Sequence, residues 1–288
     1  MTDAKTFLLT GATEGIGKAA ALDFARRGAR LVLVGRNPEK TERVVAELRR
    51  ASGNDQLEPL IGDLSRISEM RRVAAEFAAR HDRLDVLVNN AGAMFTTRQL
   101  SADGIEMTFA LNHLAYFVVT HALLDVLKKT PGSRIVSTAS GAHASGKLDL
   151  DDVVRRDRRY SGFEVYGSSK LANILFTREL GRRLAGSGTI ATCFHPGFVR
   201  TGFGANSGIA MRTLVKVAGT LFGRTPEKGA ETLVWLATSD EAGHGQGDYF
   251  MDCKPARRSR RAKDDALAAR LWTLTESVLA AHPDPAAR

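Results

Sequence analysis

The chain has 288 residues, of which 43% are hydrophobic and 25% are charged, the proportions of an ordinary globular protein. Its formal net charge is +9, and its two cysteines, Cys193 and Cys253, provide no disulfide framework. The first residues lack the pattern of a secretory signal, and no uninterrupted apolar run reaches the length that spans a membrane. We therefore expect a cytoplasmic protein without stable membrane insertion.

Short apolar runs alternate with longer amphipathic segments along the whole chain. Strands are predicted over Thr6–Thr10, Arg30–Val34, Leu57–Ile61, Asp85–Val88, Arg134–Thr138, Ile190–Phe194 and Asp248–Met251. Helices are predicted over Gly17–Arg27, Lys40–Ser52, Ile67–Arg80, Ala102–Lys128, Tyr166–Ala185 and Pro226–Thr238. This alternation indicates βαβ units, whose right-handed crossovers give a doubly wound parallel sheet with helices on both faces. We expect one α/β domain over residues 1–288, with about seven strands.

Much of the positive charge lies near the end of the chain. Six of the ten residues 254–263 (KPARRSRRAK) are basic. The segment has no interleaved aromatic residues, recognition-helix pattern or zinc-ligand spacing, so we do not expect nucleic acid as a partner. We interpret residues 254–288 as a solvated basic connector followed by a C-terminal helix, with contact to an anionic surface or ligand as the minor alternative.

The first predicted strand ends in a glycine-rich turn, Thr10-Gly-Ala-Thr-Glu-Gly-Ile-Gly17, and a helix follows. In dinucleotide-binding folds a turn in this position holds the pyrophosphate at the helix N-terminus. Gly11 permits the tight turn, Gly15 lets the backbone approach the phosphates, and Gly17 allows close helix–strand packing. The strand–turn–helix context therefore predicts a Rossmann fold that binds a dinucleotide.

Tyr166 and Lys170 are four residues apart on one predicted helix, so they lie on the same face. A free tyrosine has a pKa near ~10, and a neighbouring cation favours its ionised form. Drawing that pKa down to about 7 would take roughly 4 kcal/mol. We expect Lys170 to lower the pKa of Tyr166 and make the phenol a general acid/base, the alternative being an ordinary surface helix face.

The motifs together resemble the short-chain dehydrogenases/reductases. The resemblance covers nearly the whole chain and implies an oxidoreductase that uses NAD(P) to act on CH–OH and C=O groups. Four motifs carry it, namely the TGxxxGxG turn, Asn89-Asn90-Ala91-Gly92, Tyr166-x-x-x-Lys170 and Pro196-Gly197. Further stretches are similar to the retinol dehydrogenase-like branch, namely Leu111–Phe117, Ser169–Phe176, His195–Thr201, Tyr249–Cys253 and Ala269–Trp272.

The resemblance implies a catalytic group of four residues. Ser140 would hydrogen-bond the substrate oxygen as charge develops there. Tyr166 would exchange the proton with that oxygen, and Lys170 would tune Tyr166 and hold the nicotinamide ribose. Asn112 would help to hold a water in a proton relay. Ser140 and Tyr166 are 26 positions apart, a long spacing that also occurs in the retinol dehydrogenase-like branch; the extra segment, Gly146–Gly162, is expected to be a loop or short helix.

The resemblance also implies the cofactor-binding residues. Asp63 would bond the adenine amine, Asn90 would lie along the cofactor, and Val199 and Thr201 would hold the carboxamide and phosphates. The full expected set is Gly11, Thr13, Glu14, Gly15, Ile16, Gly17, Arg36, Asp63, Leu64, Asn90, Ala91, Gly92, Tyr166, Lys170, Pro196, Gly197, Val199 and Thr201. No metal site is expected, because the seven histidines are scattered without ligand spacing.

The end of the second predicted strand indicates which cofactor is used. NAD-specific relatives place an acidic residue there, which bonds the ribose 2′-hydroxyl. This chain has Gly35 followed by Arg36, and a guanidinium suits a phosphate dianion. We therefore favour NADP(H) and keep NAD(H) open, because Glu14 stands where some NADP-preferring relatives carry a basic residue.

Residues 202–224 mix glycines with large apolar residues and are predicted to form a lid over the substrate. We therefore expect an apolar aldehyde or ketone and its alcohol as the substrate pair. An NAD(H)-dependent secondary-alcohol or steroid dehydrogenase is the alternative enzyme, and a non-catalytic NADP(H)-binding redox sensor is the alternative of another class. Family members are often dimers or tetramers built on the Asn112 and Tyr166 helices, and a charged C-terminal extension leaves a monomer open.

Overall fold

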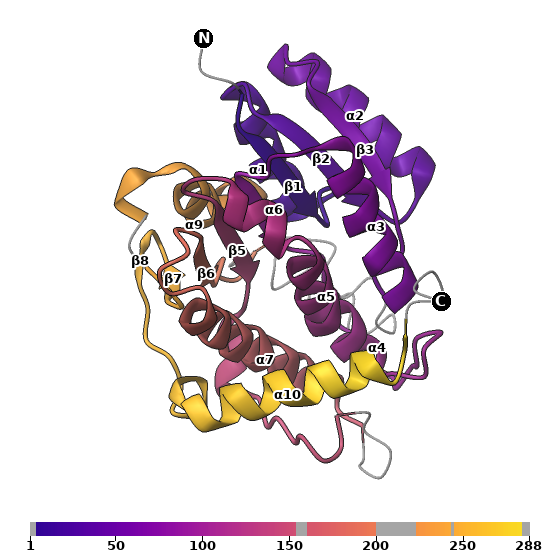
Figure 1. The fold of residues 1–288 in the computed structure, drawn as a ribbon, viewed down its shortest axis with the longest axis vertical. Helices are drawn as coiled ribbons and strands as arrows, with labels where there is room; N and C mark the ends of the chain where they lie inside the picture. The colour runs from indigo at the N-terminus through magenta and orange to yellow at the C-terminus, as the bar shows by residue number, and fades with distance from the viewer. Residues whose placement is uncertain (1–3, 154–159, 200–222, 243–244, 284–288) are drawn as a thin grey trace.

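The structure is a computed structural model that describes residues 4–153, 160–199, 223–242 and 245–283. One eight-stranded sheet runs through it in the order β3-β2-β1-β4-β5-β6-β7-β8 (Figure 1). The strands are β1 (Thr6–Thr10), β2 (Arg30–Gly35), β3 (Leu57–Ile61), β4 (Val86–Asn89), β5 (Arg134–Thr138), β6 (Ile190–Phe194), β7 (Tyr249–Met251) and β8 (Lys254–Pro255). All pairs are parallel except β7–β8. This architecture confirms the predicted Rossmann fold.

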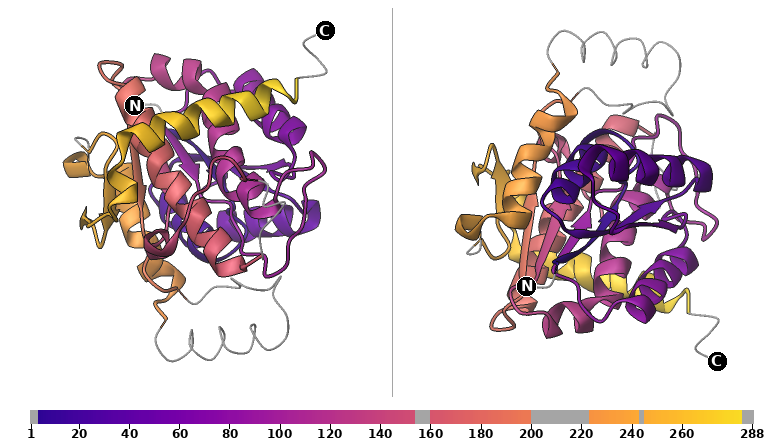
Figure 2. Two further views of the ribbon diagram at one scale, coloured as in Figure 1. Left: turned by 90° about the horizontal axis from the view of Figure 1, so that it is seen from below. Right: turned by 90° about the horizontal axis from the view of Figure 1, so that it is seen from above.

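Helices cover both faces of the sheet, and each face has its own apolar core. One core joins the sheet to α1 (Gly15–Arg26), α2 (Pro38–Ser52) and α9 (Pro226–Thr238). The other joins it to α3 (Ile67–Arg80), α5 (Ala115–Ala122), α7 (Gly162–Arg183) and α10 (Asp265–Ala280). Leu8 faces one core and Leu9 the other, because side chains alternate along a strand. Figure 2 shows α10 in yellow lying across the outside of α7.

The strand order reverses at β1 and β4, and doubly wound sheets form a crevice at the carboxyl ends of the strands where this happens. From β1 the chain builds outward to β2 and β3, then returns to place β4 on the other side of β1. Helices on the two sides leave this point in opposite directions, so ligands of doubly wound sheets bind there. The glycine-rich turn follows β1 at this point, as the sequence predicts.

The predicted helix Ala102–Lys128 is wrong in its extent. Helix α4 (Met107–Phe109) begins only after Glu106, whose carboxylate accepts hydrogen bonds from the N–H groups of Thr108 and Phe109. A π-helical turn (Ala110–Leu114) follows, and a break at Leu123 separates α5 from α6 (Leu124–Lys129). A buried N-cap and a π-turn are set by tertiary contacts, which an amphipathic pattern does not reveal.

The eighth strand is a second departure from prediction. Asp252 and Cys253 both have positive φ angles, 51° and 57°, the backbone form of a two-residue hairpin turn. This turn pairs Met251 with Lys254 and makes the start of the predicted basic connector an edge strand. The predicted C-terminal helix corresponds to α10. Most of the predicted lid, residues 202–224, lies outside the described residues.

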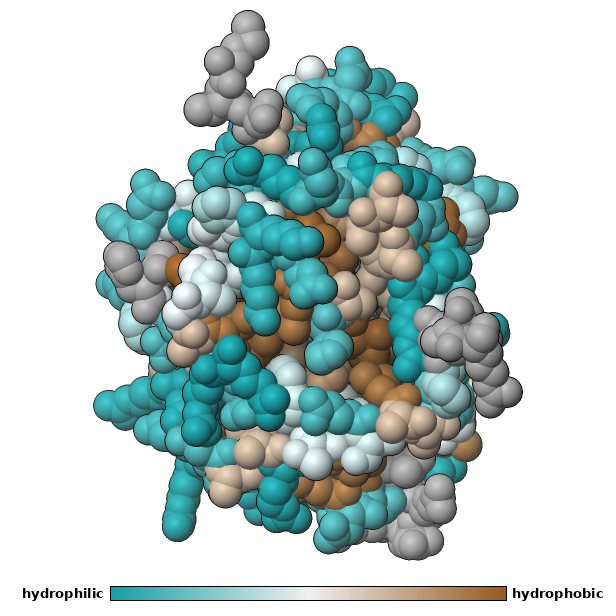
Figure 3. Space-filling model, viewed as in Figure 1, coloured by the Kyte–Doolittle hydropathy of each residue, from teal (hydrophilic) through white to brown (hydrophobic). Residues whose placement is uncertain are grey.

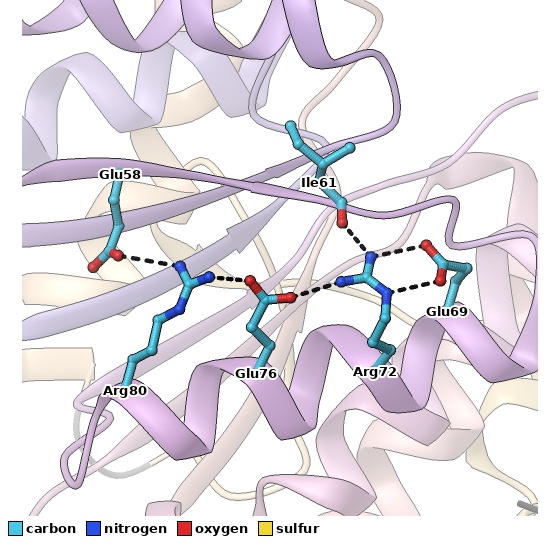
Figure 4. Close-up of polar contacts among 6 residues, drawn as sticks. All are labelled: Glu58, Ile61, Glu69, Arg72, Glu76 and Arg80. Atoms are coloured by element: carbon cyan, nitrogen blue, oxygen red, sulfur yellow. Dashed lines mark hydrogen bonds and ion pairs between the residues drawn. The ribbon is translucent and has the colours of Figure 1, made fainter. Parts of the chain in front are cut away.

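Charged residues on α3 tie that helix to the neighbouring strand β3 (Figure 4). Arg72 pairs with Glu69 and Glu76 at 2.8 and 2.6 Å and donates to the carbonyl of Ile61. Arg80 pairs with Glu76 and reaches Glu58 on β3. These side chains are partly exposed, so each pair contributes only about 0–1 kcal/mol; the core contributes more.

Figure 3 shows hydrophilic side chains over much of one face, with apolar side chains gathered towards its middle. In the part of the chain that the structure describes, no helix is long and apolar enough to cross a membrane.

We predict that Gly181→Ala destabilises the fold. A Cβ on Gly181 would lie 2.7 Å from the backbone nitrogen of Gly247 and 2.8 Å from its Cα, so α7 would have to move away from that loop. Overpacking of this kind costs about 1–3 kcal/mol. The neighbouring Arg182→Ala, on the exposed side of α7, is the control and should cost less than about 1 kcal/mol. Equal midpoints of urea unfolding for the two variants would contradict the close contact.

Candidate active site

The glycine-rich turn has the backbone form that its sequence predicts. Gly11 and Gly15 have positive φ angles of 66° and 54°, which glycine adopts without steric cost. A Cβ on Gly17 would lie 2.2 Å from the carbonyl oxygen of Gly11. Ile16 packs against the core, while the side chain of Glu14, the N-cap residue, makes no capping hydrogen bond. The first N–H groups of α1 therefore lack a side-chain cap, as an anion-binding helix start requires.

Asn90 ties together the strand ends at the crevice. Its backbone N–H and that of Ala91 both donate to Thr10 Oγ1, at 2.9 and 3.1 Å. Its side-chain Nδ2 donates to the carbonyl of Gly11 at 3.1 Å, and its Oδ1 accepts from Thr138 Oγ1 at 3.1 Å. The Asn90 side chain thus links β1, β4 and β5, and its expected contact with a cofactor stays a prediction.

The end of β2 has no room for a side chain at residue 35. A Cβ on Gly35 would lie 2.1 Å from Thr41 Oγ1 and 2.9 Å from Thr13 Cγ2. A carboxylate at this position would require Thr41 to move. Arg36, the next residue, is exposed.

Lys40 adds a second cation beside Arg36, at the start of α2. Its Nζ lies 2.5 Å from Glu14 Oε2, and the two side chains are 37% and 65% exposed. Ion pairs this exposed are weak, so a competing anion can displace Glu14 from Lys40 at small cost. Sequence reasoning missed Lys40, although a lysine within one turn of Arg36 was the available signal.

Asp63 and Leu64 follow β3, and Gly92 follows β4; their expected contacts with a cofactor stay predictions. Asp63 accepts hydrogen bonds from the N–H and Oγ of Ser65 at 3.1 and 2.8 Å, and Leu64 is buried. A Cβ on Gly92 would lie 3.0 Å from Asn112 Oδ1 and 3.5 Å from Lys170 Nζ. The glycine therefore lets the backbone after β4 approach both polar groups.

The segment after β6 carries Pro196, Gly197 and Val199. Gly197 has a φ of 81°, and a Cβ on it would lie 2.7 Å from Arg224 Nε. Val199 pairs with Arg224 in a β-bridge. Thr201 lies outside the described residues, so its expected contact stays a prediction.

Ser140 and Tyr166 come together in the fold although 26 positions separate them. Ser140 follows β5 and is the N-cap of the 3-10 helix η2 (Gly141–Ser145), where its Oγ accepts from Ala142 N at 3.1 Å. Its hydroxyl also hydrogen-bonds that of Tyr166. Two hydroxyl groups are thus paired at the crevice, as catalysis at one carbonyl oxygen would require.

Lys170 is buried without a carboxylate partner among the described residues. Its Nζ donates to the carbonyl of Thr138 at 3.1 Å. The same atom lies 5.6 Å from the ring centroid of Tyr166 and 5.7 Å from that of Tyr116, within the range of cation–π attraction. One backbone carbonyl and two phenol rings therefore surround this ammonium.

Burial changes the pKa values that the sequence suggests. It lowers the pKa of Lys170 to about 7 and raises the pKa of Tyr166, although the hydrogen bond from Ser140 opposes the second shift. The expectation that Lys170 lowers the pKa of Tyr166 is wrong, because burial raises that pKa. With a pKa about 7, Lys170 is only partly charged at neutral pH, so desolvation of the phenol outweighs its attraction.

Asn112 lies in the π-turn and clamps the segment after β4. Its Oδ1 accepts from Ala93 N at 2.9 Å, while its Nδ2 donates to Ala93 O and to Ser169 Oγ, both at 3.0 Å. Ser169 lies between Tyr166 and Lys170 on α7, so the clamp joins three elements. The side-chain amide of Asn112 is therefore bonded to protein groups. Its expected role in holding a water stays a prediction.

Tyr116 and Thr138 are site residues that sequence reasoning missed. Tyr116 is fully buried, and its ring centroid lies 5.7 Å from Lys170 Nζ. Tyr116 is four positions after Asn112 in the sequence. This helical spacing could have placed both residues on one face. The Thr138 contact to Lys170 uses a backbone carbonyl, which no residue pattern reveals.

Known proteins are similar to this chain over most of its length. The model of the short chain dehydrogenase family matches residues 5–211. The human protein retinol dehydrogenase 13 is 39% identical over 272 residues, covering 93% of this chain and 82% of its own. DnrU of Streptomyces sp. (strain C5), a proposed daunorubicin C-13 ketoreductase, is 39% identical over 280 residues, covering 96% and 92%.

Two solved structures are similar over most of the chain. A protein of Mycobacterium paratuberculosis without an assigned function has a TM-score of 0.77 at 34% identity, covering 95% of this chain and 92% of its own. A proposed short chain dehydrogenase of Escherichia coli CFT073, complexed with NADPH, has a TM-score of 0.67 at 26% identity, covering 85% and 95%.

The chain belongs to the short-chain dehydrogenase/reductase family. This confirms the predicted family and its likeness to the retinol dehydrogenases. The protein is an oxidoreductase that acts on CH–OH and C=O groups. Among the described residues, no group of three or more His, Cys, Asp or Glu side chains could hold a metal ion.

We predict that Lys170→Met stabilises the protein at neutral pH and below. The pKa of Lys170 is about 7 in the fold and near ~10.4 when unfolded, so between these values the unfolded chain binds the extra proton. The stability of the wild type should rise with pH in this window, by up to about 1.4 kcal/mol per pH unit. Denaturant unfolding of both proteins from pH 6 to 9 measures the difference; a difference that does not vary with pH would contradict the shifted pKa.

Proposed function

We propose that this chain is an NADP(H)-dependent carbonyl reductase/alcohol dehydrogenase with Tyr166 as its general acid/base. The observation that carries the proposal is the hydroxyl pair of Tyr166 and Ser140, with the buried Lys170 beside Tyr166. These groups lie at the carboxyl edge of the sheet, next to the glycine-rich turn. A bound nicotinamide would supply or accept the hydride at this edge.

Several features support a phosphorylated dinucleotide as the cofactor. The uncapped start of α1, with positive φ at Gly11 and Gly15, suits a pyrophosphate. Arg36 and Lys40 suit a 2′-phosphate, and the tight packing at Gly35 disfavours the carboxylate of NAD-specific relatives. The E. coli structure similar to this chain was solved with NADPH.

The chain's own residues favour reduction over oxidation. Because burial raises the pKa of Tyr166, its phenol stays protonated at neutral pH and can give a proton to a carbonyl oxygen. Ser140 would hydrogen-bond the same oxygen as negative charge develops on it. Lys170, partly charged at pH 7, would stabilise the phenolate that remains.

An apolar carbonyl compound is the substrate class that we propose. Met94 and Phe95 are buried in the segment after Gly92, and Phe163, one turn before Tyr166 on α7, is 60% exposed. One relative is named a retinol dehydrogenase, and another is a proposed daunorubicin C-13 ketoreductase. An NAD(H)-dependent secondary-alcohol or steroid dehydrogenase is the second candidate enzyme. The redox-sensor alternative is less favoured, because Tyr166 and Lys170 are both present.

Assembly and location stay predictions. A homodimer or homotetramer, a lid formed by residues 202–224 and a cytoplasmic location each come from the sequence or the family resemblance.

We predict that Tyr166→Phe loses turnover by about 10²–10⁴-fold, the usual contribution of a general acid, while NADPH still binds. The ring and its contact with Lys170 remain, and the hydroxyl group that would exchange the proton is removed. Turnover is followed by NADPH absorbance with a panel of apolar aldehydes, ketones and retinoids, and binding by calorimetry. Turnover close to that of the wild type would refute the proton-transfer role.

We predict that Arg36→Gln and Lys40→Gln each lower kcat/KM for NADPH at least several-fold and leave that for NADH nearly unchanged. Each loses a cation that would face the 2′-phosphate, a group that NADH lacks. Glu14→Gln should shift the ratio the other way, since it frees Lys40 from its ion pair. Arg43→Gln, an exposed arginine further along α2, is the matched control. Equal losses with both cofactors would contradict the phosphate contact.

A further inference from the structure

The four candidate catalytic residues sit on three elements, and residues 254–280 contact all three. Ser140 is on the η2 turn, Asn112 is on the π-turn before α5, and Tyr166 and Lys170 are on α7. We call residues 254–280 the C-terminal strap. We expected its first half to be a solvated connector, and most of its basic side chains are exposed. Ser259 and Arg261 nevertheless hydrogen-bond the rest of the fold, and Ala262 is buried.

The first half of the strap binds the Ser140 turn. The N–H of Ser259 donates to His143 Nε2 at 3.2 Å, which leaves the proton of the neutral imidazole on Nδ1. That Nδ1 donates to the carbonyl of Ser140 at 2.7 Å. Arg261 donates to the carbonyl of Gly146, at the end of the same turn, at 3.1 Å. His143 therefore relays the position of the strap to Ser140, and burial keeps its pKa below the ordinary value so that it stays neutral.

The second half of the strap reaches the π-turn through one buried hydrogen bond. Thr275 Oγ1, on α10, donates to the carbonyl of Leu271 at 2.8 Å. It must therefore accept from His113 Nε2, which lies 3.2 Å away. His113 is fully buried and directly follows Asn112 in the π-turn. Without this acceptor the buried donor would be left unsatisfied, which is unfavourable in a protein interior.

The same helix packs on α7 and α5 through aromatic contacts. The ring of Trp272 stacks on Phe176 of α7 with centroids 5.9 Å apart and meets Phe117 of α5 edge-on at 4.7 Å. Arg183 of α7 lies over the same indole at 4.3 Å. At the other end of the contact Arg178 pairs with Asp265 at 2.5 Å. α10 is thus held along much of α7.

This cover is needed because α7 is buried on every side. All thirteen residues from Val165 to Thr177 are buried, and a helix that is buried all round must be enclosed by packed elements. The sheet, η2 and α5 enclose it from within, and α10 covers the outside (Figures 1 and 2). A second copy of the chain that packed on these faces of α5 and α7 would have to displace α10.

We propose that the C-terminal strap is an intramolecular buttress that positions the catalytic groups, with His143 and Thr275 as its positioning residues. Neither residue contacts the substrate in this account. Each fixes the backbone of an element that carries a catalytic residue, and misplacement of a catalytic group by a fraction of an ångström to 1 Å is enough to slow a reaction by one to two orders of magnitude. The effect on turnover rests on the proposed function; the effect on the helices does not.

The test compares Thr275→Val with Thr273→Val in the full chain. Valine keeps the size of threonine but leaves His113 Nε2 without its acceptor, whereas Thr273 is exposed on the same helix. We expect Thr275→Val to lower kcat about tenfold with KM for NADPH within twofold of wild type, and Thr275→Ser to restore kcat. Assays run well below the measured unfolding midpoint, so that loss of folded protein does not contribute. Wild-type kcat in Thr275→Val, or an equal loss in Thr273→Val, would overturn the proposal.

Hydrogen exchange of residues 110–122 separates failure of the buttress from failure of the proposed function. If the wild type reduces no carbonyl in the panel, the proposed function fails, and the buttress is judged by exchange alone. Amides of this segment should then exchange about tenfold faster in Thr275→Val than in Thr273→Val, because a tertiary anchor has been removed. Equal exchange rates in the two variants would overturn the buttress whatever the enzyme assay shows.

Discussion

Burial of the Lys170 ammonium is the constraint on which the site depends. A charged group in a protein interior is costly unless it is paired or solvated by fixed dipoles. Here its neighbours are the Thr138 carbonyl and the rings of Tyr116 and Tyr166. These weak partners hold the lysine in place but do not compensate fully, so its pKa falls to about 7.

The surrounding structure follows from keeping this lysine in one place. Gly92 leaves room for the Asn112 amide, because a Cβ at this position would lie 3.0 Å from Asn112 Oδ1. Asn112 clamps that backbone and, through Ser169, the helix that carries the lysine. The C-terminal strap then braces the far side of the same helix. Burial of Lys170 destabilises the folded state, and the two apolar cores stabilise it. Functional sites often cost stability in this way.

The fold class could be predicted from the sequence because it depends on short-range patterns. The alternation of strands and helices indicated a doubly wound parallel sheet, and the Gly11–Gly17 turn placed the expected dinucleotide site after the first strand. Contacts through backbone atoms and across long distances were missed. The carbonyl of Thr138, the Lys40–Glu14 pair and the bond between Thr275 and His113, residues 162 positions apart, leave no periodic signal. The predicted pKa shift of Tyr166 failed for a related reason, because desolvation depends on the packing of the whole fold.

A direct titration of Lys170 tests the account most simply. Protein containing lysine labelled with carbon-13 at Cε can be followed by NMR from pH 5 to 11, with Lys170→Met to assign the resonance. We predict one lysine signal that titrates near pH 7 and is absent from the variant. If every lysine in the wild type titrates near ~10.4, Lys170 is not desolvated as described and the basis of the proposed acid/base chemistry is wrong.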